Sequence, residues 1–341
     1  MDEAQVRLAA WLGVTEDWVS FGPSTTQNTY ILSKAFEDWL SSDDVVIVTN
    51  QDHESNSGPW RRLAAKGIEI REWSIDKETG RLDVSGLESN LCDRVKLVAF
   101  PHCSNIIGEI HPVADWVEII HNAGAYACVD GVSYAPHGLP NVPSLGADIY
   151  LFSTYKTFGP HQGVLVMSPE LAFRLPNQGH EFNGGNPTKR FTPAGPDHAQ
   201  VAAIAGIVDY FEQIDAHHYP ESDPSFVQDR VNAILREQEV LLTTKLLDQV
   251  DRLSRARLLG PSDPSVKAPT ISLCCNRPGI AVARDLADLG IIAGGGDFYG
   301  GRVLDAMGIE RNHGVLRLSL VHYNSMDEVD RLSEALVSTL G

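Results

Sequence analysis

Short apolar runs alternate with amphipathic stretches along roughly the first 215 residues of the chain. The runs at 45–49, 95–100, 125–129 and 149–152 are apolar throughout, which is typical of strands covered on both faces of a sheet. Amphipathic stretches such as 112–123 lie between them and have helical spacing. Strands that alternate with helices form βαβ units, so this pattern predicts an α/β domain with a mainly parallel sheet.

The pattern changes after a loop-rich region at 175–196 and a helical stretch at 199–213. His217-His218-Tyr219-Pro220 follows and marks the expected boundary between a large domain, residues 1–216, and a smaller α+β domain, residues 217–341. The elements expected in the smaller domain are a helix at 226–247, a strand at 269–275, a helix at 280–289, a strand at 314–320, and a last helix that begins near Ser325 with a capping box to Glu328.

Charge and cysteine content narrow the class of protein. Lys and Arg total 27 against 45 Asp and Glu, a net charge of −18, which argues against nucleic acid or an anionic membrane as a partner. No apolar run reaches the ~18 residues of a membrane span. Five cysteines without a CxxC pair do not form a disulfide framework, and the first residues lack the features of a signal peptide, so we expect a cytoplasmic protein.

Two residues with chemical potential follow neighbouring strands. Asp130 ends the run at 125–129, and Lys156 comes shortly after the run at 149–152, within Ser153-Thr-Tyr-Lys156. Ligands bind at the carboxyl ends of parallel strands, so the two side chains are expected to converge. A buried lysine amine can hold an aldehyde as a Schiff base, and a carboxylate can keep a pyridine nitrogen protonated. Taken singly, Asp130 also fits a helix cap and Lys156 a surface lysine; together they favour pyridoxal 5'-phosphate (PLP) chemistry.

The stretch Val129-Asp-Gly131 … Ala147-Asp-Ile-Tyr-Leu-Phe-Ser-Thr-Tyr-Lys-Thr-Phe-Gly-Pro-His-Gln-Gly163 resembles the signature of PLP-dependent fold-type I, class V enzymes. That family includes aminotransferases, cysteine desulfurases and selenocysteine lyases, and the resemblance runs from about residue 20 to the C-terminus. It implies a fold-type I PLP-dependent transferase in which Lys156 forms the Schiff base and Asp130 pairs with the pyridinium. It also implies that Ser153 and Tyr155 contact the cofactor phosphate.

Two upstream motifs extend the resemblance. Ser24-Thr25-Thr26 precedes a helical pattern, where hydroxyls and backbone N–H groups can bind an anion, and the family places its phosphate cup here. We therefore expect Thr25 and Thr26 to bind the phosphate, although a plain helix cap is the alternative. Asp52-His53-Glu54 resembles the motif whose histidine stacks on the cofactor ring, so we assign His53 to stacking and proton handling rather than to a solvated loop.

Three further residues complete the expected site. Asn105, in His102-Cys-Ser-Asn105, is expected to reach the cofactor's phenolic oxygen or the substrate; a turn residue is the alternative. Arg317 resembles the arginine that binds the substrate carboxylate as a bidentate fork. Ser133 stands where the family has a glutamine that touches the cofactor's phenolic oxygen. The resemblance implies that Ser133 substitutes for it with a shorter reach. A zinc site formed by His102, His111 and His121 matches no known spacing of zinc ligands, so we expect no metal. The simpler interpretation of His102 and His111 is that they are solvated loop histidines.

The chain departs from desulfurases in the segment before the arginine strand. Residues 290–302, Gly-Ile-Ile-Ala-Gly-Gly-Gly-Asp-Phe-Tyr-Gly-Gly-Arg, contain no cysteine, so a persulfide mechanism is not expected. The partner-subunit phosphate motif, usually Gly-Thr-Pro, reads Gly195-Pro-Asp-His198. The chain also begins later than the family usually does, which predicts a shortened form or a mis-assigned start.

The sequence thus predicts a PLP-dependent transferase or lyase that acts on an amino acid and works as a homodimer. Transamination, C–S elimination, desulfuration and epimerisation share these residues and stay open. A non-catalytic PLP-fold protein is the alternative from another class. A nucleotide-binding enzyme is disfavoured because neither GxGxxG nor GxxxxGK[ST] occurs.

Overall fold

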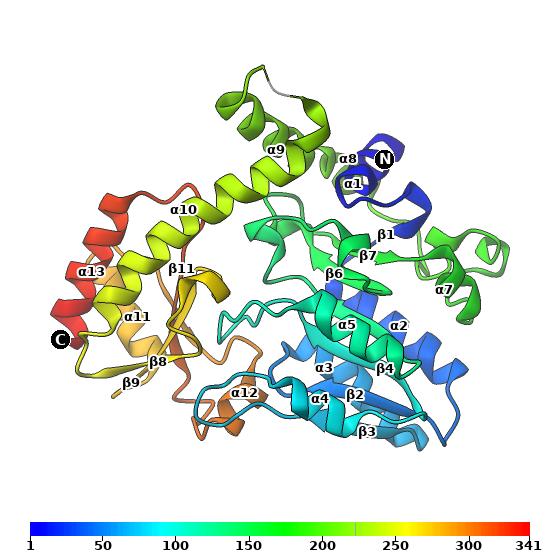
Figure 1. Ribbon diagram of the computed structural model, residues 1–341, viewed down its shortest axis with the longest axis horizontal. Helices are drawn as coiled ribbons and strands as arrows, with labels where there is room; N and C mark the ends of the chain where they lie inside the picture. The colour runs from blue at the N-terminus through cyan, green and yellow to red at the C-terminus, as the bar shows by residue number, and fades with distance from the viewer. Residues whose placement is uncertain (222) are drawn as a thin grey trace.

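The computed structural model of the chain describes residues 1–221 and 223–341 and contains two sheets (Figure 1). The strands of the larger sheet lie in the order β1-β7-β6-β5-β4-β2-β3. Their bounds are β1 Val19–Gly22, β2 Val45–Thr49, β3 Glu69–Trp73, β4 Val95–Pro101, β5 Tyr126–Asp130, β6 Ile149–Ser153 and β7 Gly163–Met167. β3, β2, β4, β5 and β6 run parallel, while β7 is antiparallel to β6 and β1. The expected α/β fold with a mainly parallel sheet is confirmed.

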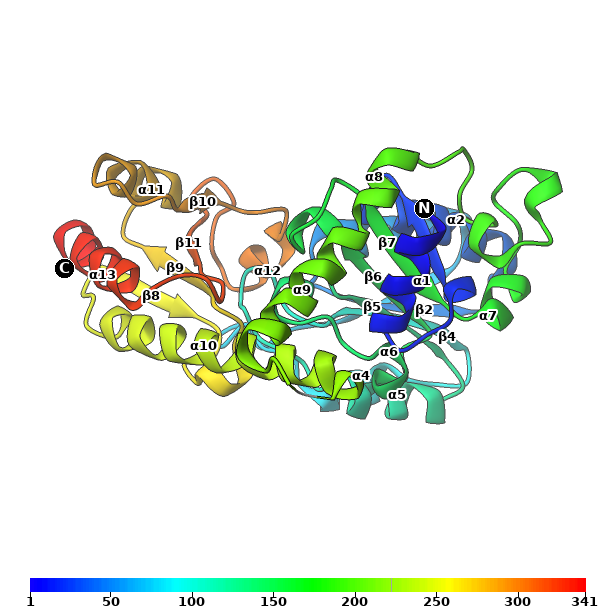
Figure 2. The ribbon, with the colours of Figure 1, turned by 90° about the horizontal axis from the view of Figure 1, so that it is seen from above.

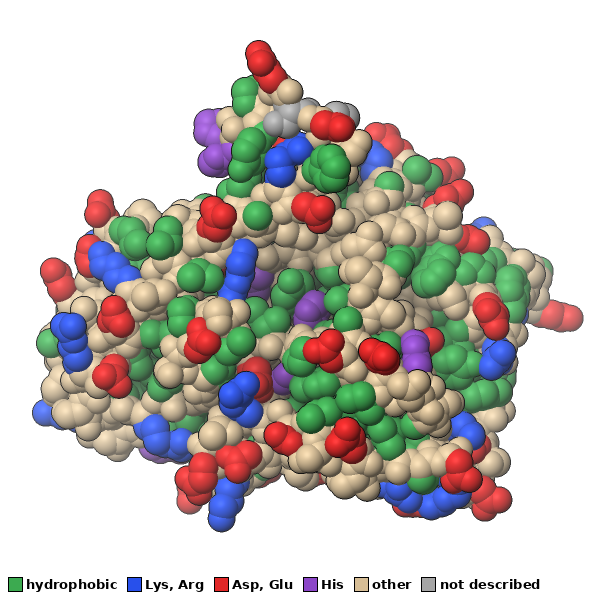
Figure 3. All heavy atoms as spheres, viewed as in Figure 1, with side chains coloured by type: hydrophobic (Ala, Val, Ile, Leu, Met, Phe, Trp, Pro, Cys, Tyr) green, Lys and Arg blue, Asp and Glu red, His purple; other side chains and the backbone are tan. Residues whose placement is uncertain are grey.

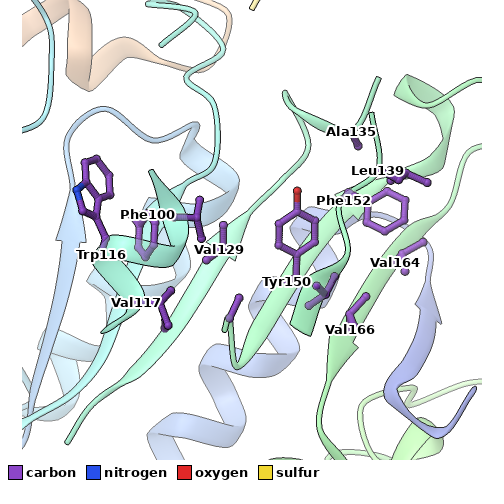
Figure 4. Packing of buried hydrophobic residues seen from close by; sticks show 14 of the residues in the cluster. Phe100, Trp116, Val117, Val129, Ala135, Leu139, Tyr150, Phe152, Val164 and Val166 are labelled. Atoms are coloured by element: carbon purple, nitrogen blue, oxygen red, sulfur yellow. The ribbon is translucent and has the colours of Figure 1, made fainter. Parts of the chain in front are cut away.

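Helices cover both faces of the larger sheet, which explains why its strands are apolar throughout. Successive side chains of a strand point to opposite faces. Val45 and Ile47 accordingly join one core cluster, and Val46 and Val48 join the other. Figure 4 shows Trp116, from helix α5 (Val113–Asn122), beside Phe100 on one of these faces. The other helices around this sheet are α1 Asp2–Trp11, α2 Thr25–Trp39, α3 Glu54–Arg61, α4 Val84–Asn90, α6 Val142–Leu145, α7 Pro169–Arg174, α8 His198–Ala203 and α9 Ala205–His218.

The smaller sheet belongs to the C-terminal part of the chain. Its strands lie in the order β10-β11-β9-β8, and its pairs are antiparallel. The elements are α10 Val227–Val250, β8 Ala256–Leu259, β9 Thr270–Cys275, α11 Gly279–Asp288, β10 Gly294–Gly296, α12 Gly301–Ala306, β11 Val315–Ser319 and α13 Met326–Leu340. The predicted capping box is present: the Ser325 hydroxyl accepts from the Glu328 N–H, and the Glu328 carboxylate accepts from the Ser325 N–H.

Helix α10 runs between the two parts of the molecule (Figure 2). Val231 and Leu235 pack in the core of the large sheet, whereas Leu242 and Leu246 pack in the core of the small sheet. One continuous helix therefore contributes to both cores, and the boundary at 216/217 stays a prediction. The helix predicted at 199–213 is divided at residue 204 into α8 and α9.

Acidic side chains are spread over the face seen in Figure 3, with basic side chains between them. This distribution agrees with the net charge of −18. Among the described residues, no helix is long and apolar enough to cross a membrane.

Candidate active site

The carboxyl ends of β2, β4, β5 and β6 meet at one edge of the large sheet, next to the start of α2. A pocket opens there, lined by Ser24, Thr25, Thr26, His53, Ser55, Pro101, Cys103, Asn105, Asp130, Val132, Ser133, Ser153, Tyr155 and Lys156. This lining contains every residue predicted for the site except Arg317. Arg317 lines an adjoining cavity that shares Thr26, His53, Ser55, Asn105, Tyr155 and Lys156 with the first. The structure thus brings all the predicted residues to one place.

Asp130 and Lys156 both line this pocket. Asp130 is buried at the end of β5, and its Oδ1 accepts from the Val132 N–H at 2.8 Å. Burial raises the pKa of Asp130 to about 6, although the Val132 N–H and the Lys156 charge act in the opposite direction. Desolvation lowers the pKa of Lys156, with Arg317 adding to the effect and Asp130 opposing it. Lys156 is still accessible to solvent through the open pocket, so its amine is both reachable and more easily deprotonated than a surface lysine.

The start of α2 forms the anion-binding side of the pocket. The Ser24 hydroxyl caps the helix by accepting from the Gln27 N–H at 3.2 Å. The buried Thr25 hydroxyl lies 2.7 Å from the Ser153 hydroxyl, which comes from the end of β6. A Cβ at Gly163 would stand 2.3 Å from the Ser24 carbonyl carbon, so glycine is needed where β7 passes this turn. Hydroxyls and free helical N–H groups in one cup suit a phosphate.

His53 caps α3 and is held in one tautomer. Its Nδ1 accepts from the Ser55 N–H at 3.0 Å, so the proton of the neutral ring is on Nε2. Burial, followed by the charges of Lys156 and Arg317, lowers the pKa of His53 to about 4. Near neutral pH the ring is therefore uncharged and offers an N–H donor from Nε2.

Asn105 and Arg317 are joined through the segment after β10. The Asn105 Nδ2 donates to the Phe298 carbonyl at 2.9 Å, and the Arg317 Nη1 donates to the Asn105 carbonyl at 3.1 Å. The Arg317 guanidinium carbon stands 3.9 Å from the centre of the Phe298 ring. Desolvation lowers the pKa of Arg317. A half-buried guanidinium beside the lysine is well placed to bind a carboxylate.

Tyr155 and Ser133 also line the pocket. The Tyr155 ring is 45% exposed and stacks on His161 with ring centres 4.6 Å apart, and the Lys156 Nζ lies 5.8 Å from the centre of the Tyr155 ring. Ser133 is half-buried and follows the strand that carries Asp130.

The interpretation of His102 and His111 as solvated loop residues is wrong, because both are buried. His102 stacks on Tyr134 with ring centres 3.6 Å apart and contacts the Tyr150 hydroxyl at 2.9 Å. The His111 Nε2 contacts the Gln51 side-chain oxygen at 2.6 Å. Burial lowers the pKa of each ring to about 3. Within residues 1–221 and 223–341, no group of three His, Cys, Asp or Glu side chains is arranged to hold a metal ion.

Cys103 is the one cysteine in the pocket lining. It is buried, and desolvation raises the pKa of its thiol to about 12. A thiolate nucleophile needs a lowered pKa, so this residue is poorly suited to persulfide chemistry. Cys275, on β9, is buried, and desolvation raises the pKa of its thiol to about 11, whereas its neighbour Cys274 is half-buried.

Two contributions to the site escaped the sequence analysis. The segment 294–299, Gly-Gly-Gly-Asp-Phe-Tyr, lacks the desulfurase cysteine, but nothing in this pattern predicts that the Phe298 ring lies on Arg317. Ser55, which fixes the His53 tautomer, gave only the signal of a small polar residue at a helix start.

Comparison with known proteins places the chain in a family. Residues 1–219 match the family model described as aminotransferase class-V. An aminotransferase-like protein of Gibberella zeae is 33% identical over 347 residues, which cover 99% of this chain and 83% of the relative. A cysteine desulfurase-like protein of Aspergillus flavus is 26% identical, over 95% of this chain and 74% of the relative.

A solved structure agrees with this placement. The apo structure of a cysteine desulfurase from Thermococcus onnurineus has a TM-score of 0.88 and 25% identity to the chain, over 99% of this chain and 83% of that one. Together with the pocket at the strand ends, these similarities show that the chain belongs to the class-V aminotransferase family and is a PLP-dependent enzyme.

Proposed function

We propose that the enzyme acts on an amino acid and that Lys156 carries the cofactor and moves the substrate proton. The observation that carries this proposal is that Asp130 ends β5 and Lys156 follows the adjacent parallel strand β6, so that both line one pocket beside the start of α2. A buried carboxyl and a desolvated amine in one pocket are uncommon outside functional sites.

The residues present fit PLP. The cup of Thr25, Thr26 and Ser153, beside the Ser24 cap, would hold the phosphate at the start of α2. Asp130 would hold the ring nitrogen, and a cation there would compensate for the burial that raises the pKa of this carboxyl to about 6. When bound, PLP supplies an aldehyde that reacts with amines and a protonated ring that accepts electrons.

The chain's own residues supply binding and proton movement. Arg317 binds the substrate carboxylate through its guanidinium, and His53 offers its Nε2–H to an acceptor in the pocket. The Lys156 amine, whose pKa is lowered by desolvation, takes a proton at Nζ and returns it. Transamination, β-elimination and epimerisation all use this set, and the persulfide route is disfavoured because residues 290–302 carry no cysteine.

We also propose a cytoplasmic homodimer. An apolar groove lined by Phe21, Tyr30, Ile31 and Phe191 runs beside Ser24, next to the phosphate cup. Burial of this surface would stabilise a dimer and complete the wall of the cup. Sedimentation of the holoenzyme at micromolar concentration tests this: a dimer supports the proposal, and a monomer alone contradicts it.

The visible absorption spectrum of the purified protein tests the function itself. With PLP supplied, the protein should show an absorption band at visible wavelengths. Addition of an amino-acid substrate should change this spectrum. A matched variant, Lys77→Ala, removes an exposed lysine and should keep both properties, whereas Lys156→Ala should lose the Schiff-base absorption that the wild type shows before any amino acid is added. A wild-type protein that neither binds PLP nor responds to any amino acid would favour the non-catalytic alternative.

A further inference from the structure

Two adjacent residues after β10 have an unfavourable backbone conformation. Phe298 and Tyr299 have φ values of 49° and 58°, in the left-handed region that non-glycine residues seldom occupy. Such strain persists only where surrounding contacts hold it, and it is often found at functional sites. The contacts of this pair therefore indicate what the strained conformation is for.

Both strained carbonyls accept hydrogen bonds from the large domain. The Glu54 N–H, at the start of α3, donates to the Tyr299 carbonyl at 2.8 Å. The Asn105 Nδ2 donates to the Phe298 carbonyl at 2.9 Å. Close packing adds to these bonds, since a Cβ at Gly300 would stand 2.7 Å from the Ile106 side chain. The pair thus joins the segment before α12 to two motifs of the pocket.

The bond to Phe298 decides how Asn105 is oriented. A backbone carbonyl can accept only from the amide nitrogen, so the Asn105 Oδ1 is turned the other way. That oxygen is buried and has no hydrogen-bond partner among the described residues. A buried acceptor without a partner is costly, so the bond from Nδ2 to Phe298 holds Asn105 in an orientation that leaves its own oxygen unsatisfied.

The Phe298 ring controls access to Arg317. It lies 3.9 Å from the guanidinium carbon and covers one face of that group. A carboxylate is therefore excluded from that face, while the edge of the guanidinium, where a bidentate pair forms, stays available. Tyr299 stands beside this position: its ring centre is 5.4 Å from that of His53, and the residue is 73% exposed at the entrance.

We propose that Phe298 and Tyr299 form the substrate-recognition element of the enzyme. Phe298 holds Arg317 and Asn105 in place, so that the Arg317 guanidinium can bind the carboxylate of the substrate. Tyr299, with Tyr30 and Tyr155 in the same cavity lining, presents apolar surface to the substrate side chain. The substrate class is then an α-amino acid with an apolar or aromatic side chain. This inference rests on the proposed function.

The test uses PLP-loaded protein and three probes: L-phenylalanine, L-alanine and 2-phenylethylamine, the last of which lacks the carboxylate. Dissociation constants come from spectral titration. In the wild type, L-phenylalanine should bind more tightly than either other probe. Phe298→Leu should lower the preference for L-phenylalanine over 2-phenylethylamine about fivefold.

Tyr299→Asn separates recognition from structure, because asparagine tolerates the left-handed conformation. It should lower the preference for L-phenylalanine over L-alanine about 10-fold, while the urea midpoint stays the same or rises. If Tyr299 only supported the fold, its replacement would lower the urea midpoint instead. Ile292→Ala, which changes a fully exposed side chain in the same segment, should match the wild type in every measurement.

The outcomes distinguish this inference from the proposed function. If the wild type binds PLP and responds to amino acids but both variants keep its preferences, the recognition role is wrong and the function stands. If the wild type gives no response to any amino acid, both fail.

Discussion

Asp130→Asn separates the effect of one carboxyl on stability from its effect on catalysis. In the cofactor-free protein, burial raises the pKa of Asp130 from 3.8 to about 6. One pKa unit corresponds to about 1.36 kcal/mol, so ionising this buried carboxyl costs the folded state about 3 kcal/mol. The residue is only 4% exposed, so little of this cost is relieved by solvent.

The sign follows from the raised pKa. Below pH 3.8 the carboxyl is protonated in both the folded and unfolded states, and the cost is absent. Between pH 3.8 and about 6 the unfolded state binds fewer protons than the folded state, so the free energy of unfolding falls as the pH rises. Above about pH 6 the wild type has lost the full ionisation cost from its stability. Asparagine does not titrate, and its side-chain oxygen can still accept from the Val132 N–H.

We therefore expect cofactor-free Asp130→Asn to match the wild type near pH 4 and to be more stable by about 3 kcal/mol at pH 7 to 8. Urea unfolding of both proteins across this pH range measures the difference. Turnover should change in the opposite direction, with a loss of roughly 100-fold or more, because the ring nitrogen is no longer held protonated. A stability difference that is constant from pH 4 to 8, or wild-type turnover, would refute this reasoning.

Three other predictions follow from the site and the core. Arg317→Lys keeps the charge but loses the bidentate fork, so KM for an amino acid should rise about 10-fold; an equal change for an amine without a carboxylate would contradict this role. Replacing all five cysteines by Ser or Ala should leave turnover in place, whereas a large loss from replacing Cys103 alone, with PLP still bound, would revive a thiol mechanism. Trp60→Ala should cost about 3–5 kcal/mol of unfolding free energy, since the side chain is fully buried against Phe36; a urea-derived loss under about 1 kcal/mol would show that the core closes around it.

Sequence patterning predicted the parts of the fold that depend on local periodicity. The four apolar runs correctly predicted strands β2, β4, β5 and β6. These strands are apolar throughout because each packs side chains into two cores. β7 was missed, although its residues Gly163–Met167 are as apolar as the others. It follows the lysine motif closely and pairs antiparallel with β6. No α-helix separates the two strands, so the alternation of strands and helices that predicted the other strands is absent here.

Topology and resemblance were sufficient to predict which residues lie in the site. Their hydrogen bonds and pKa shifts depend on burial and on distances between distant parts of the sequence, so only the structure shows them. Strand order explains why Asp130 and Lys156 line one pocket although 26 positions separate them. The Nδ1 contact that fixes His53, and the Phe298 ring on Arg317, arise from backbone geometry that no periodicity encodes. The burial of His102 was likewise invisible, because its partner Tyr150 lies on another strand.

Chemical trapping tests most directly whether Lys156 carries the cofactor. The PLP-loaded protein is reduced with borohydride, digested, and mapped by mass spectrometry. The account predicts a pyridoxyl group on Lys156, in the peptide that continues Thr-Phe-Gly-Pro-His-Gln-Gly. A pyridoxyl group on another lysine, or none on any peptide with PLP supplied in excess, would contradict it.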